Sequence, residues 1–110
     1  MSKYLIEASY TAEGAKCLMK QGGTARRAVV QKMVESLGGR LDVFYFAFGE
    51  GDVYLIFDVP DNPTAAAISL AVAATGAIRL KTIVLVTLEE MDQATKKPVH
   101  YDLPGWEGVG

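Results

Sequence analysis

The sequence predicts an α+β domain in which strands and helices follow the order βαββαβ, with one more helix near the C-terminus. Two observations lead to this fold class. Runs of alternating apolar residues, typical of strands, are separated by segments whose apolar residues recur at helical spacing. In the middle of the chain, two strongly β-prone runs between Phe44 and Pro60 flank a short Gly-Glu-Gly-Asp connection, which is typical of an antiparallel hairpin.

The length and composition are those of a single globular domain. The chain has 110 residues, of which 50% are hydrophobic and 22% are charged. The net charge of -2 gives no electrostatic basis for binding nucleic acid, and no apolar run reaches the length of a membrane span. A single cysteine excludes an intrachain disulfide and a cysteine-based zinc site, and the N-terminus lacks the apolar region of a signal peptide. We therefore expect a cytoplasmic protein with neither a membrane nor a nucleic-acid partner.

The first part of the chain predicts a strand and two helical segments. Residues 3–10 alternate in the manner of a strand. Thr11 is expected to cap a short helix over residues 12–21, and Thr24 to cap a second helix after a pair of glycines. The helical spacing in this second segment predicts a buried stripe made of Val30, Met33, Val34 and Leu37.

The hairpin strands are expected over residues 40–48 and 52–59. Gly49 and Gly51 can adopt positive φ without steric cost, which lets the chain reverse within a few residues. The aromatic residues divide between the two faces of the first strand: Phe44, Phe46 and Phe48 on one face and Tyr45 on the other. We expect them to pack in a core or an interface, with the floor of a cavity for an aromatic ligand as the alternative.

A second helix-strand unit follows the hairpin. Asn62 followed by Pro63 is a typical helix start, with a capping side chain and proline at the first helical position. This helix is expected over residues 64–75, with Ile68, Leu70 and Val72 as its bulky residues. Residues 77–87 are expected to form the fourth strand, in a central position because residues 83–86 are continuously apolar.

The chain is then expected to end in a short helix and a tail. Thr87 precedes a helix over residues 88–96 whose first turn carries Glu89 and Glu90, and Pro98 ends it. Residues 1–97 therefore form a ferredoxin-like domain, an antiparallel sheet with helices on one face, and residues 98–110 form the tail.

Helices on one face leave the other side of the sheet, here called the open face, without a cover. Charged residues avoid a helix-covered core, so the polar members of one strand parity should lie on the open face. These are Glu7, Ser9, Tyr54, Asp58, Arg79 and Lys81. The same parity contains Leu5, Ile56, Ile83 and Leu85, which makes the surface too apolar to be simply solvated. A second copy of the chain covering this face is the simplest explanation, so we expect a homodimer or higher oligomer.

Three segments of the sequence resemble those of a known protein family. The hairpin sequence from Phe48 to Tyr54 resembles the signature of GYD domain proteins, as do the opening strand and residues 75–82. The resemblance covers residues 3–95. It implies a fold similar to dimeric α+β barrels, in which two ferredoxin-like sheets enclose a cavity. Gly49 and Asp52 match the signature, but Gly51 stands where the family's tyrosine is expected, and Tyr54 is the nearby tyrosine.

The open face and the hairpin supply the candidate site residues. Asp52 and Tyr54 are the candidates for proton transfer, although an aspartate in a glycine turn also commonly accepts backbone N–H groups and holds the turn. Glu7, Ser9, Asp58, Arg79 and Lys81 are the candidates for binding a small acid or enol. The alternative for these charged residues is ion pairing, between subunits or in a solvated edge.

Three other features have weaker links to chemistry. His100, the only histidine, lies in the tail, and the sequence contains no metal-ligand spacing. Arg26 and Arg27 near a helix start could hold a phosphate or carboxylate but match no phosphate-loop pattern. Cys17 is expected to be an inert buried thiol. The sequence implies no cofactor.

Two functions are compatible with these features. In the first, a homo-oligomer binds a small apolar or aromatic metabolite in a sheet-lined cavity, and turns it over without a cofactor if it is an enzyme. In the second, the open face and the tail serve only assembly or regulation. The sequence leaves open whether the protein is an enzyme.

Overall fold

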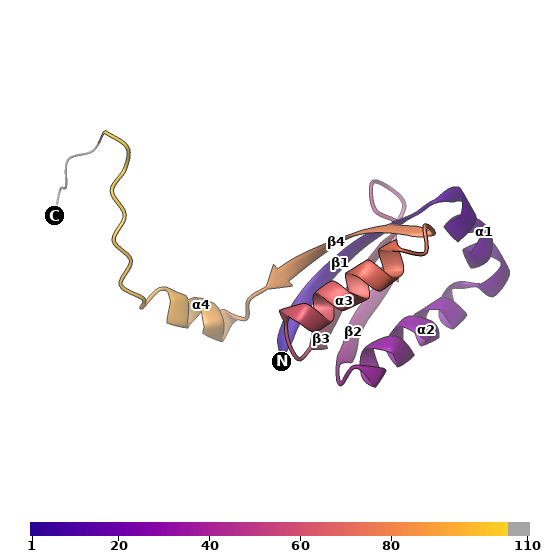
Figure 1. Ribbon diagram of the computed structural model, residues 1–110, viewed down its shortest axis with the longest axis horizontal. Helices are drawn as coiled ribbons and strands as arrows, with labels where there is room; N and C mark the ends of the chain where they lie inside the picture. Colours follow the sequence, from indigo (N-terminus) through magenta and orange to yellow (C-terminus); the bar gives the residue numbers. More distant parts are fainter. Residues whose placement is uncertain (106–110) are drawn as a thin grey trace.

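A computed structural model describes residues 1–105 and contains an antiparallel sheet of four strands (Figure 1). The strands are β1 (Ser2–Tyr10), β2 (Arg40–Phe46), β3 (Val53–Val59) and β4 (Ile78–Leu85). They lie in the order β2-β3-β1-β4, and every neighbouring pair is antiparallel. This α+β arrangement is compatible with the predicted ferredoxin-like fold, which is confirmed at this level.

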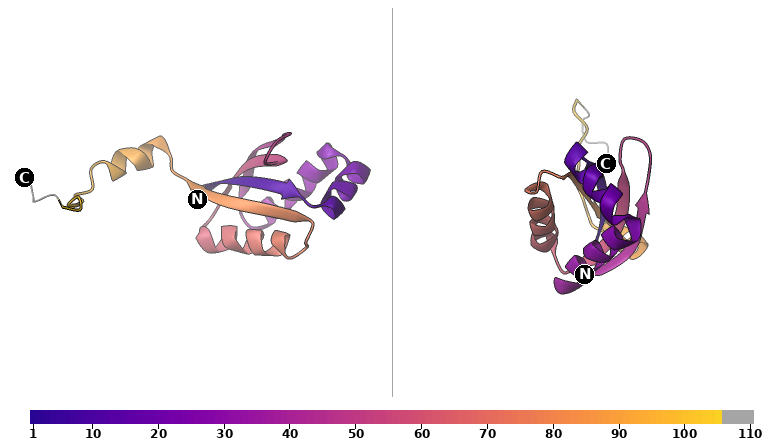
Figure 2. Two further views of the ribbon diagram at one scale, coloured as in Figure 1. Left: turned by 90° about the horizontal axis from the view of Figure 1, so that it is seen from above. Right: turned by 90° about the vertical axis from the view of Figure 1, so that its right-hand side faces the viewer.

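The helices in the described part of the chain are α1 (Ala12–Gln21), α2 (Gly23–Ser36), α3 (Asn62–Ala73) and α4 (Leu88–Ala94). The first three lie on one side of the sheet, whereas α4 lies away from it (Figure 2). α2 packs against β2, and α3 packs against β4. Thr11 caps α1 as predicted, because its side chain accepts a hydrogen bond from the Gly14 N–H.

The core lies between the sheet and helices α2 and α3. Tyr4 and Phe57, on the two central strands, are almost fully buried, and their rings lie 5.9 Å apart between centroids. Val34 of α2 and Ile68 of α3 close the core from the helix side. The helix-covered parity of β1 is therefore the one that contains Tyr4, and the opposite parity forms the open face.

Two helices begin earlier than their predicted caps imply, α2 by two residues and α3 by one. α2 starts at Gly23 after Gly22, whose φ is 81°, and it has no side-chain cap, so Thr24 is not the N-cap. Asp61, not Asn62, caps α3, and its carboxylate accepts the Thr64 N–H at 2.9 Å. An aspartate next to an asparagine offers two equally good capping side chains, and the sequence alone does not choose between them.

Two predicted packing residues are exposed. Leu70 is 73% exposed on α3, and Leu37 lies just beyond α2 as its C-cap and is 41% exposed. The helical spacing identified the buried faces through Val30, Val34 and Ile68. It could not show where each helix extends past the sheet that would cover it.

The hairpin connection is longer than predicted and spans residues 47–52. Neither Gly49 nor Gly51 has positive φ, because a connection of this length reverses the chain without left-handed residues. Phe48 lies in this connection and is fully exposed, so it does not pack with Phe44 and Phe46. Those two rings contact each other edge to face, with centroids 5.3 Å apart.

β4 is an edge strand, not the predicted central one. Its apolar end is uncovered: Ile83, Val84 and Val86 are all largely exposed. The continuous apolar run was interpreted as a strand buried on both faces. Within residues 1–105 it is a strand whose end no other element covers.

The C-terminal segment leaves the body of the domain (Figure 1). The Cα radius of gyration is 18.3 Å, against about 13 Å for a compact chain of this length. α4 has the predicted capping box between Thr87 and Glu90, and none of its residues is buried. Trp106, assigned to the tail, lies outside the described residues. None of the helices in residues 1–105 is long and apolar enough to cross a membrane.

Candidate functional site

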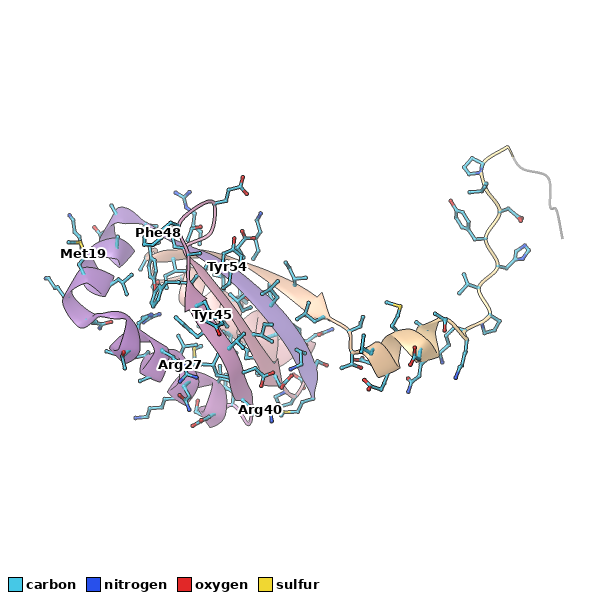
Figure 3. The ribbon with its side chains drawn as sticks, turned by 180° about the vertical axis from the view of Figure 1, so that it is seen from behind. Met19, Arg27, Arg40, Tyr45, Phe48 and Tyr54 are labelled. Atoms are coloured by element: carbon cyan, nitrogen blue, oxygen red, sulfur yellow. The ribbon has the colours of Figure 1, made fainter. Side chains whose placement is uncertain are left out.

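The candidate site lies at one end of the open face, which faces the viewer in Figure 3. The strand register places Glu7 of β1 between Tyr54 of β3 and Lys81 of β4. Ser9, two residues along β1 on the same face, is opposite Arg79. The register therefore gathers most of the residues predicted for binding or proton transfer. We call this group the polar end: Glu7, Ser9, Tyr54, Arg79 and Lys81.

A hydrogen bond joins the two central residues of the polar end. The Tyr54 hydroxyl donates to Glu7 Oε1 at 3.1 Å. Because this bond favours the protonated phenol, Glu7 raises the pKa of Tyr54 above its ordinary value. Tyr54 is therefore a neutral phenol that donates a hydrogen bond, and the Glu7 side chain accepts it.

A hollow of about 300 Å³ opens between β1, β4 and the hairpin connection. Its polar lining comes from Glu7, Ser9, Arg79, Lys81 and Glu50, and the Ser9 hydroxyl donates to the Glu50 backbone oxygen at 3.0 Å. Within the described residues, neither Arg79 nor Lys81 forms a salt bridge. The hollow thus combines two cations available for an anion with two acidic side chains and the Ser9 hydroxyl. Glu50 was not predicted, since its place above β1 depends on the path of the hairpin connection.

Asp52 is held by the backbone and does not join the polar end. Its carboxylate accepts the Tyr10 N–H at 2.8 Å, and its own N–H donates to the Ala8 carbonyl at 2.8 Å. These bonds attach the hairpin to the end of β1. Asp52 therefore makes the turn-holding contact that is the alternative to a role in proton transfer.

Asp58 lies at the opposite end of the open face, in a charged cluster. Its carboxylate contacts Lys3 Nζ at 3.0 Å and Arg40 Nη2 at 3.3 Å, and it is buried. Asp42 binds the same two cations, with Arg40 Nε at 3.0 Å. The hydrogen bond with Asp42 raises the pKa of Lys3, and Lys3 in turn lowers the pKa of Asp42. Asp58 is thus paired within one chain and is separated from the other predicted ligand-binding residues.

The sequence did not reveal this charged cluster. A register shift between Leu41 and Val43 lets Asp42 reach Lys3, which lies 39 positions away in the sequence. No local pattern indicates such a shift. The alternation of β2 alone would have left Asp42 on the face occupied by the helices.

An apolar band separates the two charged ends of the open face. One side chain from each strand contributes to it: Val43, Ile56, Leu5 and Ile83, which are aligned by the strand register. Ile83 and Val43 are exposed, and Leu5 and Ile56 are partly exposed. The open face therefore presents an apolar strip directly beside the polar end.

The remaining candidates lie away from this face. The His100 side chain is almost fully exposed, and its Nε2 lies 3.5 Å from Asp102 Oδ2. Cys17 is exposed on α1, so the prediction of a buried thiol is wrong. Gly14 is the only buried residue of α1, and Cys17 lies on a part of this helix that the described residues leave exposed. In the part of the chain that the structure describes, no group of histidine, cysteine and acidic residues could hold a metal ion.

Comparison with known proteins supports the family resemblance on which the hairpin was interpreted. The sequence model of the GYD domain family matches residues 4–95. The chain belongs to the GYD domain family. Comparisons with curated proteins and with solved structures find no match to it.

The structure gives a physical reason for the departure of this GYD domain from the signature at Gly51. A Cβ atom at this position would lie 2.8 Å from the Tyr54 hydroxyl oxygen and 3.0 Å from Glu7 Cγ. Gly51 is buried under these two side chains. A tyrosine at position 51 would therefore displace the Tyr54–Glu7 pair, and in this protein Tyr54 occupies that space.

Proposed function

We propose that this GYD domain protein is a homo-oligomer that binds a small apolar or aromatic metabolite between the open face and a second copy of the chain. The observation that carries this proposal is that the polar end adjoins the apolar band on a face that none of the described helices covers. An apolar surface of this kind is normally covered by a partner, and convergent polar groups beside it suit a ligand.

The polar end indicates how such a ligand would be held. Arg79 and Lys81 bind an acidic or enolic oxygen of the ligand in this proposal, and the apolar band contacts its flat or apolar part. If the ligand is turned over, Tyr54 supplies a proton to a developing oxyanion, and Glu7 accepts one. Asp52 is the second choice for proton transfer because its carboxylate already accepts a backbone N–H. The chemistry requires no cofactor.

The alternative is an assembly module without a ligand. The exposed apolar run at the end of β4 favours it, because Ile83, Val84 and Val86 add apolar surface that a partner would cover. In that case the open face of one copy would pack directly on that of another. The hollow at the polar end would then be filled by side chains.

Native mass spectrometry of the full chain, purified under mild conditions, separates the two functions. The expected result is a dimer or higher oligomer that carries a small molecule. Lys81→Gln should reduce the retained ligand and leave the oligomer intact, because Lys81 binds the ligand in this proposal. An oligomer that never carries a ligand would favour the assembly module.

A second pair of variants tests the open face as the interface. Ile83→Asp places a charge in the apolar band and should shift the protein toward monomer in size-exclusion chromatography with light scattering. Leu70→Asp is the matched control, since Leu70 is equally apolar and more exposed, but lies on α3 on the other side. An equal effect of both variants, or none of Ile83→Asp, would contradict the proposed interface.

A further inference from the structure

We propose a second ligand site, on the helix side of the sheet, that binds the carboxylate of an amphipathic molecule with an apolar chain. The site is the crevice that runs between α1 and α2 on one side and α3 on the other. It lies on the opposite side of the sheet from the polar end, and does not depend on the function proposed for that face.

The crevice exists because the helices cover the edges of the sheet. α2 packs over β2 and α3 over β4, which are the two edge strands (Figure 2). Two adjoining hollows lie between them, one of about 70 Å³ over the central strands and one of about 340 Å³ toward α1. They are adjoining because they share the same wall residues: Tyr10, Arg26, Met33, Val72 and Ile78.

The inner hollow is apolar except at its shared wall. Most of its lining is aliphatic or aromatic, including Phe44, Leu55 and Ile68. Arg26 and Tyr10 are the only polar side chains in that lining. A volume of about 70 Å³ holds only about two or three methylene groups. Most of a longer apolar chain therefore lies in the larger hollow beside Cys17, with its polar group at Arg26 and Tyr10.

Arg26 is a cation without a carboxylate partner. It is partly buried, and within residues 1–105 it forms no salt bridge. Burial raises the pKa of Tyr10, and the Arg26 guanidinium beside it opposes that rise. Tyr10 thus stays a phenol that can donate to the same anion. A guanidinium beside a hydroxyl, at the mouth of an apolar crevice, is complementary to a carboxylate on an apolar chain.

The next residue provides a natural comparison. Arg27 is exposed and its Nη1 donates to Gln31 Oε1 at 2.9 Å on the outer surface of α2. It does not line either hollow. The two arginines carry the same charge and lie on the same helix, but only Arg26 borders the crevice. Arg27 is therefore the matched control for Arg26.

Cys17 makes binding measurable without labelling the ligand. It is the only cysteine of the chain, it is exposed, and it lines the larger hollow. A molecule in the crevice should therefore slow the reaction of the Cys17 thiol with a chromogenic thiol reagent. This readout does not involve the open face, so a ligand bound there would leave the rate unchanged.

The experiment titrates the full-length protein with decanoate and measures both the heat of binding and the rate of thiol reaction. We expect saturable binding that slows the reaction, and an affinity at least about tenfold weaker in Arg26→Gln, from the loss of a charge-assisted hydrogen bond. Arg27→Gln should bind decanoate as the unmodified protein does. Decanol should bind equally to the protein and to Arg26→Gln, because it carries no charge.

Three outcomes would overturn the proposal. The first is the absence of saturable decanoate binding in a protein with unchanged circular dichroism. The second is an equal loss of affinity in Arg26→Gln and Arg27→Gln, which would indicate only a general attraction of the anion to positive charge. The third is a Cys17 thiol that is already protected and becomes reactive on dilution to monomer, which would show that a second copy of the chain occupies the crevice. Loss of ligand binding on the open face, in contrast, leaves the decanoate result unaffected.

Discussion

Replacing Gly14 by alanine is expected to destabilise the protein, although alanine favours helices. Gly14 is the only buried residue of α1. A Cβ atom added there would lie 2.1 Å from the Ala77 carbonyl oxygen, whereas ordinary contact begins at 3.4 Å. The obstacle is backbone and cannot rotate away, so α1 must move by more than about 1 Å from the turn that precedes β4.

That movement breaks the hydrogen bonds that attach α1 to this turn. The Thr11 N–H donates to the Ala77 oxygen at 2.9 Å, and the Thr11 hydroxyl is 3.0 Å from the Gly76 oxygen. Loss of each hydrogen bond lowers the free energy of unfolding by about 1 kcal/mol. The higher helix propensity of alanine raises it by about 1 kcal/mol and so offsets part of that loss. With the accompanying loss of packing, we expect Gly14→Ala to lower the free energy of unfolding by roughly 1–2 kcal/mol.

Urea denaturation followed by far-ultraviolet circular dichroism, at one fixed protein concentration, measures this change. Gly23→Ala is the control, because it is also helical and its added Cβ would meet only the ring of Phe46, at 2.8 Å. That ring is partly exposed and can turn aside, so we expect a change within about 0.5 kcal/mol. The reasoning is refuted if Gly14→Ala is as stable as the unmodified protein, or if Gly23→Ala is the less stable of the two.

Three further predictions concern charge, capping and the polar end. Because Lys3 lowers the pKa of Asp42 in the folded state, that pairing stabilises the protein at neutral pH and is lost as the pH falls through the lowered value. The unmodified protein should therefore lose more free energy of unfolding than Asp42→Asn between about pH 5 and pH 2, and parallel curves would contradict this. Thr87→Ala removes the cap of α4, which should speed amide hydrogen exchange in that helix and leave the melting temperature of the domain unchanged, since no residue of α4 is buried. Glu7→Gln should lower the pKa of Tyr54. The Tyr54 titration is obtained by subtracting the spectrophotometric phenol titration of the Glu7→Gln, Tyr54→Phe double variant from that of Glu7→Gln. A Tyr54 pKa equal to that of the unmodified protein would exclude the hydrogen bond.

Local sequence patterns predicted the helices and strands more accurately than their boundaries. The order of strands and helices along the chain followed from the spacing of apolar residues and from turn residues, because strands and helices have different periods. Helical spacing likewise predicted the buried residues Val30 and Val34 of α2 and Ile68 of α3. The boundaries were less accurate, as with Asp61 in place of Asn62, because neighbouring residues compete to cap one helix.

The position of β4 illustrates a different limit. A continuous apolar run is equally compatible with a strand buried on both faces and with a strand whose end is exposed. The apolar residues 83–86 predict a strand buried on both faces, whereas in the structure β4 is an edge strand with an exposed end. The sequence records how apolar a surface is, but not which molecule covers it.

The sequence by itself determined the order of the elements, the GYD domain family, and the parity that places Glu7, Ser9, Tyr54, Arg79 and Lys81 on one face. These properties depend on local periodicity and on short motifs, which the order of residues contains directly. Only the tertiary structure decided that these residues form one polar end, that Asp58 pairs with Lys3 at the other, and that Arg26 borders a crevice. Those relations depend on strand register and helix placement, which join residues far apart in the chain through contacts that no local pattern records.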